Sequence, residues 1–80
     1  MELTQENVNV GIDYIQNFTT ANGRSIQLVE IESGTNIIKV RFTEISGSPN
    51  LTMTNAIMLE LVENYFKMEY PDCAEVVQVL

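Results

Sequence analysis

Apolar residues near the start of the chain recur every three or four positions, which is the spacing of one helix face. The hydroxyl of Thr4 is suited to cap the first turn of such a helix. Asn22 and Gly23 tolerate the left-handed backbone with which many helices end. The pattern therefore predicts a helix over 4–20. Its expected buried face consists of Val8, Ile12, Ile15 and Phe18.

Two strands are predicted next, over 25–31 and 37–43, because both segments are rich in isoleucine, valine and leucine. In the second, apolar residues alternate with Lys39 and Arg41, which is typical of a half-buried strand. The first alternates less cleanly, so its buried face stays open. Residues 32–36 read Glu-Ser-Gly-Thr-Asn and predict a hairpin loop.

A second helix is predicted over 51–70, after a turn-forming loop at 45–50. Pro71 follows at a point where a helix cannot easily continue. The valine-rich segment 75–80 then predicts a last strand. The apolar stripe of the second helix consists of Met58, Leu61, Val62, Tyr65 and Phe66.

The order helix, strand, strand, helix, strand predicts an α+β fold of two layers, with two helices on one face of a small three-stranded mixed sheet. The connection through the second helix is expected to be a right-handed crossover if the strands that it joins are parallel neighbours. Eighty residues allow one domain at most, so 1–80 is taken as a single domain.

The chain is acidic, with 11 acidic and 4 basic residues and a net charge of −7. Nucleic acid and anionic membranes both attract basic surfaces, so neither is an expected partner. A basic protein partner is compatible with this charge, and so is a simple solubilising role. No apolar run approaches the roughly 20 residues of a membrane span, and no signal peptide is recognised. With one cysteine, a reducing, cytoplasmic location is expected.

Catalytic chemistry has little support in this sequence. The chain has no histidine, which removes the histidine-dependent catalytic sets. Its glycines do not form a phosphate-binding fingerprint. Glu60 and Glu63 lie at helical spacing and are interpreted as a solvated face rather than an acid–base pair. We therefore expect the protein not to be an enzyme.

The sulfur-containing residues are expected to be structural. Cys73 is a weak candidate metal ligand, because zinc and iron–sulfur sites collect about four ligands. A packed cysteine is the favoured interpretation, although an oligomer could pool several thiols. Gap filling in or near the core is expected for Met53, Met58 and Met68. The start of the second helix could receive an anion, but a side-chain cap is favoured, from Ser48, Asn50 or Thr52.

Taken in order, these segments resemble the C-terminal domain of NifU-like iron–sulfur assembly proteins along nearly the whole chain. That family runs as a helix, an Ala-Asp-Gly-Gly turn, two strands, a Cys-Ser-Gly-Cys-Pro loop, a Thr-Met-Thr helix start and a valine-rich strand. Here the turn reads Ala-Asn-Gly-Arg, the loop Ile-Ser-Gly-Ser-Pro and the helix start Thr-Met-Thr. The similar segments are 12–15, 21–25, 26–31, 38–43, 45–49, 51–54 and 75–79.

The departure from the family lies at its two cluster-binding cysteines, whose positions are held by Ile45 and Ser48. Isoleucine has no donor atom, and a serine hydroxyl is a poor ligand beside a thiolate. The resemblance thus implies no cofactor and a non-catalytic accessory module for iron–sulfur cluster assembly. Its expected partners are assembly or target proteins, or a cysteine-bearing relative. The expected contact loop consists of Ile45, Ser46, Gly47, Ser48 and Pro49. The alternative is an iron or iron–sulfur carrier that uses Cys73 in an oligomer.

Overall fold

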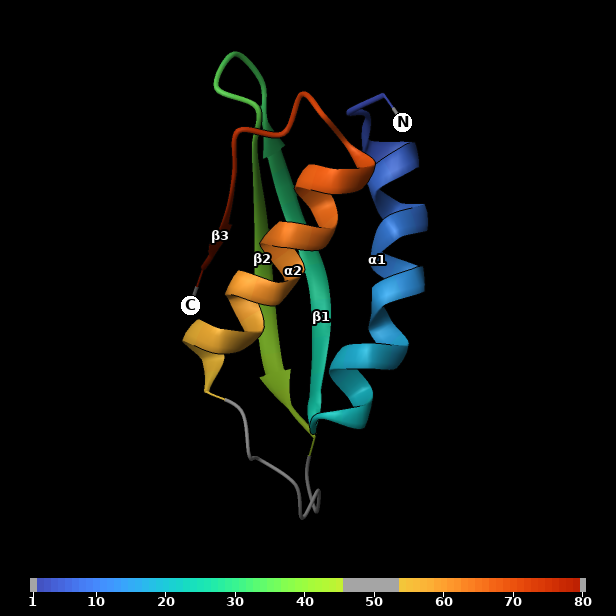
Figure 1. Ribbon diagram of the computed structural model, residues 1–80, viewed down its shortest axis with the longest axis vertical. Coiled ribbons are helices and arrows are strands. Elements are labelled where there is room, and N and C mark those ends of the chain that lie inside the picture. The colour runs from blue at the N-terminus through green and yellow to red at the C-terminus, as the bar shows by residue number, and fades with distance from the viewer. Residues whose placement is uncertain (1, 46–53, 80) are drawn as a thin grey trace.

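A computed structural model describes residues 2–45 and 54–79, and it confirms the predicted α+β fold. The elements are α1 (Gln5–Ala21), β1 (Arg24–Glu32), β2 (Ile37–Glu44), α2 (Asn55–Glu69) and β3 (Glu75–Gln78). The strands form one mixed sheet in the order β1-β2-β3, in which β1 and β2 are antiparallel and β2 and β3 are parallel. Figure 1 shows both helices on the same face of this sheet, so neither of the described helices covers the opposite face.

The connection from β2 to β3 passes through α2, which lies in front of the sheet in Figure 1 and runs opposite to both strands. Seen this way, the crossover has the right-handed sense expected of parallel neighbours. Two hydrogen bonds extend the pairing beyond β3, from Ala74 N–H to the Asn36 carbonyl (3.0 Å) and from Val79 N–H to the Val40 carbonyl (2.8 Å). The last strand is shorter than the predicted 75–80, whose final residue lies outside the described residues.

α1 begins and ends close to the predicted limits. Thr4 caps it by accepting a hydrogen bond from the Asn7 amide at 3.1 Å. At its end, the amides of Asn22 and Gly23 donate to carbonyls of the last turn. Gly23 has a φ of 80°, a conformation that favours glycine, and this lets the chain reverse into β1.

Apolar spacing overestimated the width of the buried stripe on both helices. Phe18 is 37% exposed, whereas the neighbouring Thr19 is fully buried. On α2, Leu61 is 40% and Met68 76% exposed, so the predictions that they lie in or near the core are wrong. Residues turn by about 100° each around a helix, and these side chains fall at the margin of the face that meets the sheet. The fully buried positions of α2 are Met58, Val62 and Phe66.

The cap of α2 is also not among the residues predicted for it. The Thr54 hydroxyl accepts from the Ile57 amide at 3.2 Å, and the helix starts at Asn55. The caps predicted from the sequence all precede Thr54, so they are wrong for this helix. Ser48, Asn50, Thr52 and Met53 lie outside the described residues.

β1 alternates poorly because it contains a bulge. Leu28 pairs with Val40 and Glu30 with Lys39, so Val29 is an extra residue opposite β2. Such an insertion shifts the inward and outward alternation of the strand. The predicted alternation of β2 is confirmed, since Ile38 and Val40 are fully buried beneath the helices.

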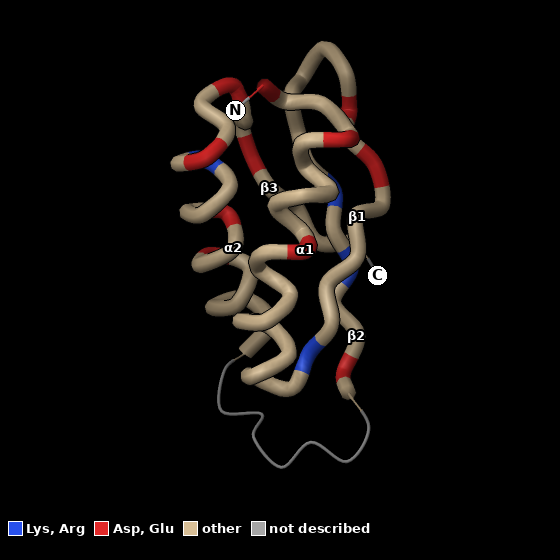
Figure 2. The backbone as a smooth tube through the Cα atoms, turned by 90° about the vertical axis from the view of Figure 1, so that its right-hand side faces the viewer, with Lys and Arg blue, Asp and Glu red and all other residues tan. Residues whose placement is uncertain are grey.

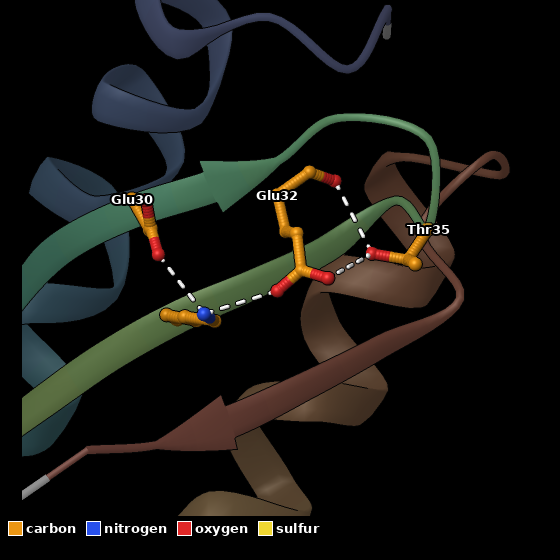
Figure 3. Close-up of polar contacts among 4 residues, drawn as sticks. Glu30, Glu32 and Thr35 are labelled. Atoms are coloured by element: carbon orange, nitrogen blue, oxygen red, sulfur yellow. Dashed lines mark hydrogen bonds and ion pairs between the residues drawn. The ribbon is translucent and has the colours of Figure 1, made fainter.

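The open face of the sheet carries a small ionic cluster at the β1–β2 hairpin. The Lys39 ammonium lies 2.9 Å from the Glu30 carboxylate and 3.0 Å from that of Glu32 (Figure 3). The Thr35 hydroxyl donates to Glu32 at 3.1 Å. Hydrogen bonds from Lys39 and Thr35 lower the pKa of Glu32. Gly34 and Asn36 both adopt positive φ, at 91° and 58°, which completes the predicted turn.

Candidate interaction surfaces

The predicted contact loop can be placed only at its first residue. Ile45 is 37% exposed, and its amide donates to the Gly23 carbonyl at 2.9 Å. Its aliphatic side chain offers no metal donor. Ser46, Gly47, Ser48 and Pro49 lie outside the residues that the structure describes, so their predicted role in binding a partner stays a prediction.

Arg24 pairs with Glu44, the residue before Ile45, and its side chain ties two elements together. It stands where the resembled turn has its second glycine, yet only 5% of it is exposed. Its Nε donates to the side-chain oxygen of Asn55, the first residue of α2, and its Nη1 to the Asn22 carbonyl at 3.5 Å. Arg24 thus holds the start of α2 against the start of β1. No local pattern in the sequence indicates this role, because Arg24 and Asn55 lie 31 residues apart.

Cys73 is packed, as predicted. It is 6% exposed, and its thiol lies 3.5 Å from the Glu75 carbonyl, to which it donates. Burial raises the pKa of this thiol, which keeps it protonated and weakens it as a metal ligand. Within residues 2–45 and 54–79, no group of three or more histidine, cysteine or acidic side chains is placed to hold a metal ion.

Exposed and half-buried apolar and aromatic side chains gather along the junction of α1 and α2. Tyr14 and Tyr65 stack there, with ring centroids 5.4 Å apart and planes inclined by 14°. Around them, Val10 is 56%, Tyr14 70% and Met68 76% exposed. Together with Glu69 they line a shallow pocket of about 390 Å³. We call the surface formed by Val10, Tyr14, Tyr65 and Met68 the helix-layer patch.

The patch continues along both helices. Phe18 follows Tyr14 by one turn on α1, and Leu61 precedes Tyr65 by one turn on α2, and both are more than a third exposed. Figure 1 shows the two helices side by side and running in opposite directions. Contiguous apolar surface of this kind is uncommon on a small monomer and commonly marks a binding surface.

A second depression lies on the other side of α2, against β3. It has a volume of about 590 Å³. Glu63 forms part of its wall and accepts a hydrogen bond from the Val76 amide at 3.0 Å. The helical spacing of Glu63 predicted a solvated carboxylate. Spacing along one helix does not reveal that the amide of a distant strand lies within reach of this side chain. The lining residues are Ala56, Leu59, Glu60, Glu63, Glu75, Val76, Val77 and Gln78, and we call this depression the α2–β3 groove.

Burial raises the pKa of Tyr65 and of Tyr70, so both phenols stay protonated near neutral pH. No described helix is long and apolar enough to cross a membrane. No protein family, characterised protein or solved structure was found to match the chain.

Proposed function

We propose that the chain is a non-catalytic protein-interaction module that binds its partner through the helix-layer patch. The observation that carries the proposal is the stacked Tyr14–Tyr65 pair flanked by Val10 and Met68, all on one surface. Tyrosine and methionine are enriched in the centres of protein interfaces, and tyrosine buries a large area at small entropic cost. A chain that used these side chains only for folding would turn them toward the sheet.

The resemblance to NifU-like domains supports a place in iron–sulfur cluster assembly, in a cytoplasmic, reducing compartment. On this proposal the domain contacts an assembly protein, a target protein or a cysteine-bearing relative and holds no cluster itself. The replacement of both ligand cysteines by Ile45 and Ser48 supports the absence of a cluster.

The alternative carrier function would have to use Cys73. That thiol is buried, donates to a backbone carbonyl and has a raised pKa, so the loop around it would have to open before metal could bind. Anaerobic reconstitution with iron and sulfide separates the two functions. The proposal expects no stoichiometric bound iron or acid-labile sulfide, whereas a stoichiometric cluster that Cys73→Ala abolishes would establish the carrier.

The interaction itself is tested by capture of a purified cysteine-bearing NifU-like domain on the immobilised chain. Met68→Glu places a charge in the patch and is expected to weaken binding about tenfold or more, as central interface positions do. Its matched control is Gln27→Glu, which adds the same charge at an exposed position of the sheet. Equal binding by both variants and the unaltered chain would refute a role for the patch.

The fold of Met68→Glu is not expected to suffer, since the side chain is 76% exposed. Surface substitutions of this kind change the free energy of unfolding by about 0.5 kcal/mol or less. Matching urea midpoints for Met68→Glu and the unaltered chain therefore make a loss of binding attributable to the surface.

A further inference from the structure

The free edge of the sheet at β3 is only partly covered. β3 pairs with β2 on one side, and none of the described strands pairs with its other side. Val79 N–H points to β2, since it donates to the Val40 carbonyl at 2.8 Å. Backbone groups alternate along a strand, so those of Val76 and Gln78 point outward, over the α2–β3 groove.

Only one of these outward groups has a partner among residues 2–45 and 54–79. Glu63 accepts from the Val76 amide at 3.0 Å. No hydrogen bond to the Val76 carbonyl or to the Gln78 amide and carbonyl is found in that part of the chain. Such groups are a template on which a further strand can pair.

The groove beside this edge has room for a peptide and a marked charge. Ala56 and Leu59 give it apolar contact surface, and its volume is about 590 Å³. Three carboxylates, from Glu60, Glu63 and Glu75, line it. Lys67 is the nearest described cation, 3.7 Å from Glu63.

The remaining basic residues lie away from the groove. Figure 2 shows that the other lysine and arginine positions belong to β1 and β2 rather than to α2 or β3. Those three residues are Arg24, Lys39 and Arg41. The charge of the groove is thus negative, and it favours an occupant with positive side chains.

We propose that the α2–β3 groove binds an extended basic segment of a partner protein, which adds a strand to the edge of β3. The backbone of the segment pairs with Gln78 and with the Val76 carbonyl. Its apolar side chains contact Ala56 and Leu59, and its lysine or arginine side chains approach Glu60 and Glu75. This site lies on the opposite side of α2 from the helix-layer patch and is independent of the proposed function.

A second copy of this chain fits the edge poorly. Pairing of β3 with β3 would bring two acidic grooves together, and each chain carries a net charge of −7. Like charges facing each other across an interface oppose association. Dimerisation through β3 is therefore an outcome that would overturn the proposal, and sedimentation at increasing concentration would detect it.

The probe for the test is a capped synthetic peptide of alternating lysine and valine, titrated into the isotopically labelled chain and followed by NMR. We expect the Gln78 amide signal to shift and its hydrogen exchange to slow about tenfold or more, because the amide gains a backbone partner. The same peptide with glutamate in place of lysine is expected to bind at least threefold more weakly. Equal binding of the two peptides, no binding, or shifts confined to the helix-layer patch would overturn the proposal.

Two changes separate strand pairing from simple charge attraction. N-methylation of the peptide's alternate amides removes the donors to the Val76 and Gln78 carbonyls and puts methyl groups between the two strands, so with the protein unaltered it is expected to prevent pairing and abolish the Gln78 protection. Gln78→Pro removes the outward donor at a place where an edge strand tolerates proline, and it is expected to weaken binding. If the N-methylated peptide binds as well as its parent, the segment does not pair with β3.

The acidic wall is tested by Glu60→Gln and Glu75→Gln, which are each expected to weaken binding about two- to fivefold, as for exposed ion pairs. Glu2→Gln is the matched control, because Glu2 is exposed and does not line the groove. Met68→Glu is expected to leave peptide binding unchanged, so failure of this site and failure of the helix-layer patch are distinguishable. Equal weakening by Glu2→Gln would contradict the assignment of the carboxylates.

Discussion

The side-chain amide of Gln16 forms two hydrogen bonds with the backbone of Ile26, accepting from its amide at 3.0 Å and donating to its carbonyl at 2.9 Å. Ile26 lies on β1, the other edge strand of the sheet. The amide of Gln16 therefore takes the place of a neighbouring strand, and it joins α1 to the sheet. The single hydrogen bond from Val76 to Glu63 covers the β3 edge less completely.

Gln16→Met is expected to lower the free energy of unfolding by about 1–3 kcal/mol, because it leaves a half-buried amide and carbonyl without partners. Methionine keeps the length and helix propensity of glutamine, so the loss reports the two hydrogen bonds. Urea unfolding measures it. Asn17→Met, at the adjacent exposed position, is the control and is expected to change the free energy by about 0.5 kcal/mol or less. A loss no larger than that of the control would contradict the bridging role.

Gly11→Ala is expected to destabilise the fold by about 1–3 kcal/mol, although alanine is the better helix former. A Cβ at this position would lie 2.5 Å from the Tyr70 hydroxyl and 3.0 Å from a Phe66 ring carbon. Tyr70 cannot retreat without breaking its hydrogen bond to the Asn7 carbonyl. Thermal or urea unfolding tests this prediction. A stabilised variant would show that α1 and α2 can move apart enough to accommodate the added methyl group.

A double variant then identifies the colliding group. Tyr70→Phe removes the hydroxyl oxygen nearest to the added Cβ, so it is expected to cost less in the Gly11→Ala background than in the unaltered chain. The interaction free energy between the two sites is expected to be about 0.5 kcal/mol or more. If the changes in unfolding free energy of Gly11→Ala and Tyr70→Phe simply add, the added Cβ does not collide with the Tyr70 hydroxyl.

Alkaline unfolding is expected to depend on Tyr70. Burial raises the pKa of its phenol above the value in the unfolded chain, and the nearby Glu69 carboxylate adds to the shift. The folded state then binds the proton more tightly, so this stabilisation is complete below about pH 10 and is lost as pH rises through the folded pKa. Unfolding free energies across pH 8–11 are expected to fall less steeply for Tyr70→Phe. Identical slopes would mean that other groups, Tyr65 among them, dominate.

Native Cys73 is expected to react slowly with iodoacetamide. Its burial hides the sulfur and raises the thiol pKa, and both effects reduce the accessible thiolate. At pH 8 we expect alkylation at least tenfold slower than in the urea-unfolded chain, as followed by mass spectrometry. Equal alkylation rates in the native and the unfolded chain would show that the segment around Cys73 opens readily. The thiol would then again be a candidate metal ligand.

The features of the fold that the sequence predicted correctly are those that depend on residues close to one another in the chain. The alternation of apolar residues located β2, and a hydroxyl before a periodic run located the cap of α1 at Thr4. The right-handed crossover was expected only if the joined strands were parallel neighbours, as β2 and β3 are. The bulge at Val29 could not be predicted, because it depends on pairing with β2. Neither could the buried position of Arg24 or the contact of Glu63 with Val76, since both join residues distant in sequence.

The candidate surfaces could not be predicted from the sequence, because apolar spacing does not distinguish a buried helix position from an exposed one at its margin. Periodicity tells which side chains share a helix face, but it does not tell how wide a strip the sheet can cover. Phe18, Leu61 and Met68 look like core residues in the sequence and lie on the outer margin of that strip in the fold. Their position explains why Met68, which the sequence assigned to the core or its margin, instead lies in the helix-layer patch.

The stacked ring pair of Tyr14 and Tyr65 has a consequence for how partners can be found. The chain contains three tyrosines and no tryptophan. Tyr70 is buried, whereas the other two rings lie on the helix-layer patch. Any change in the near-ultraviolet emission of the chain at constant fold therefore arises largely at this surface. Binding of a partner that contains neither tryptophan nor tyrosine can therefore be followed from the emission of the unlabelled chain.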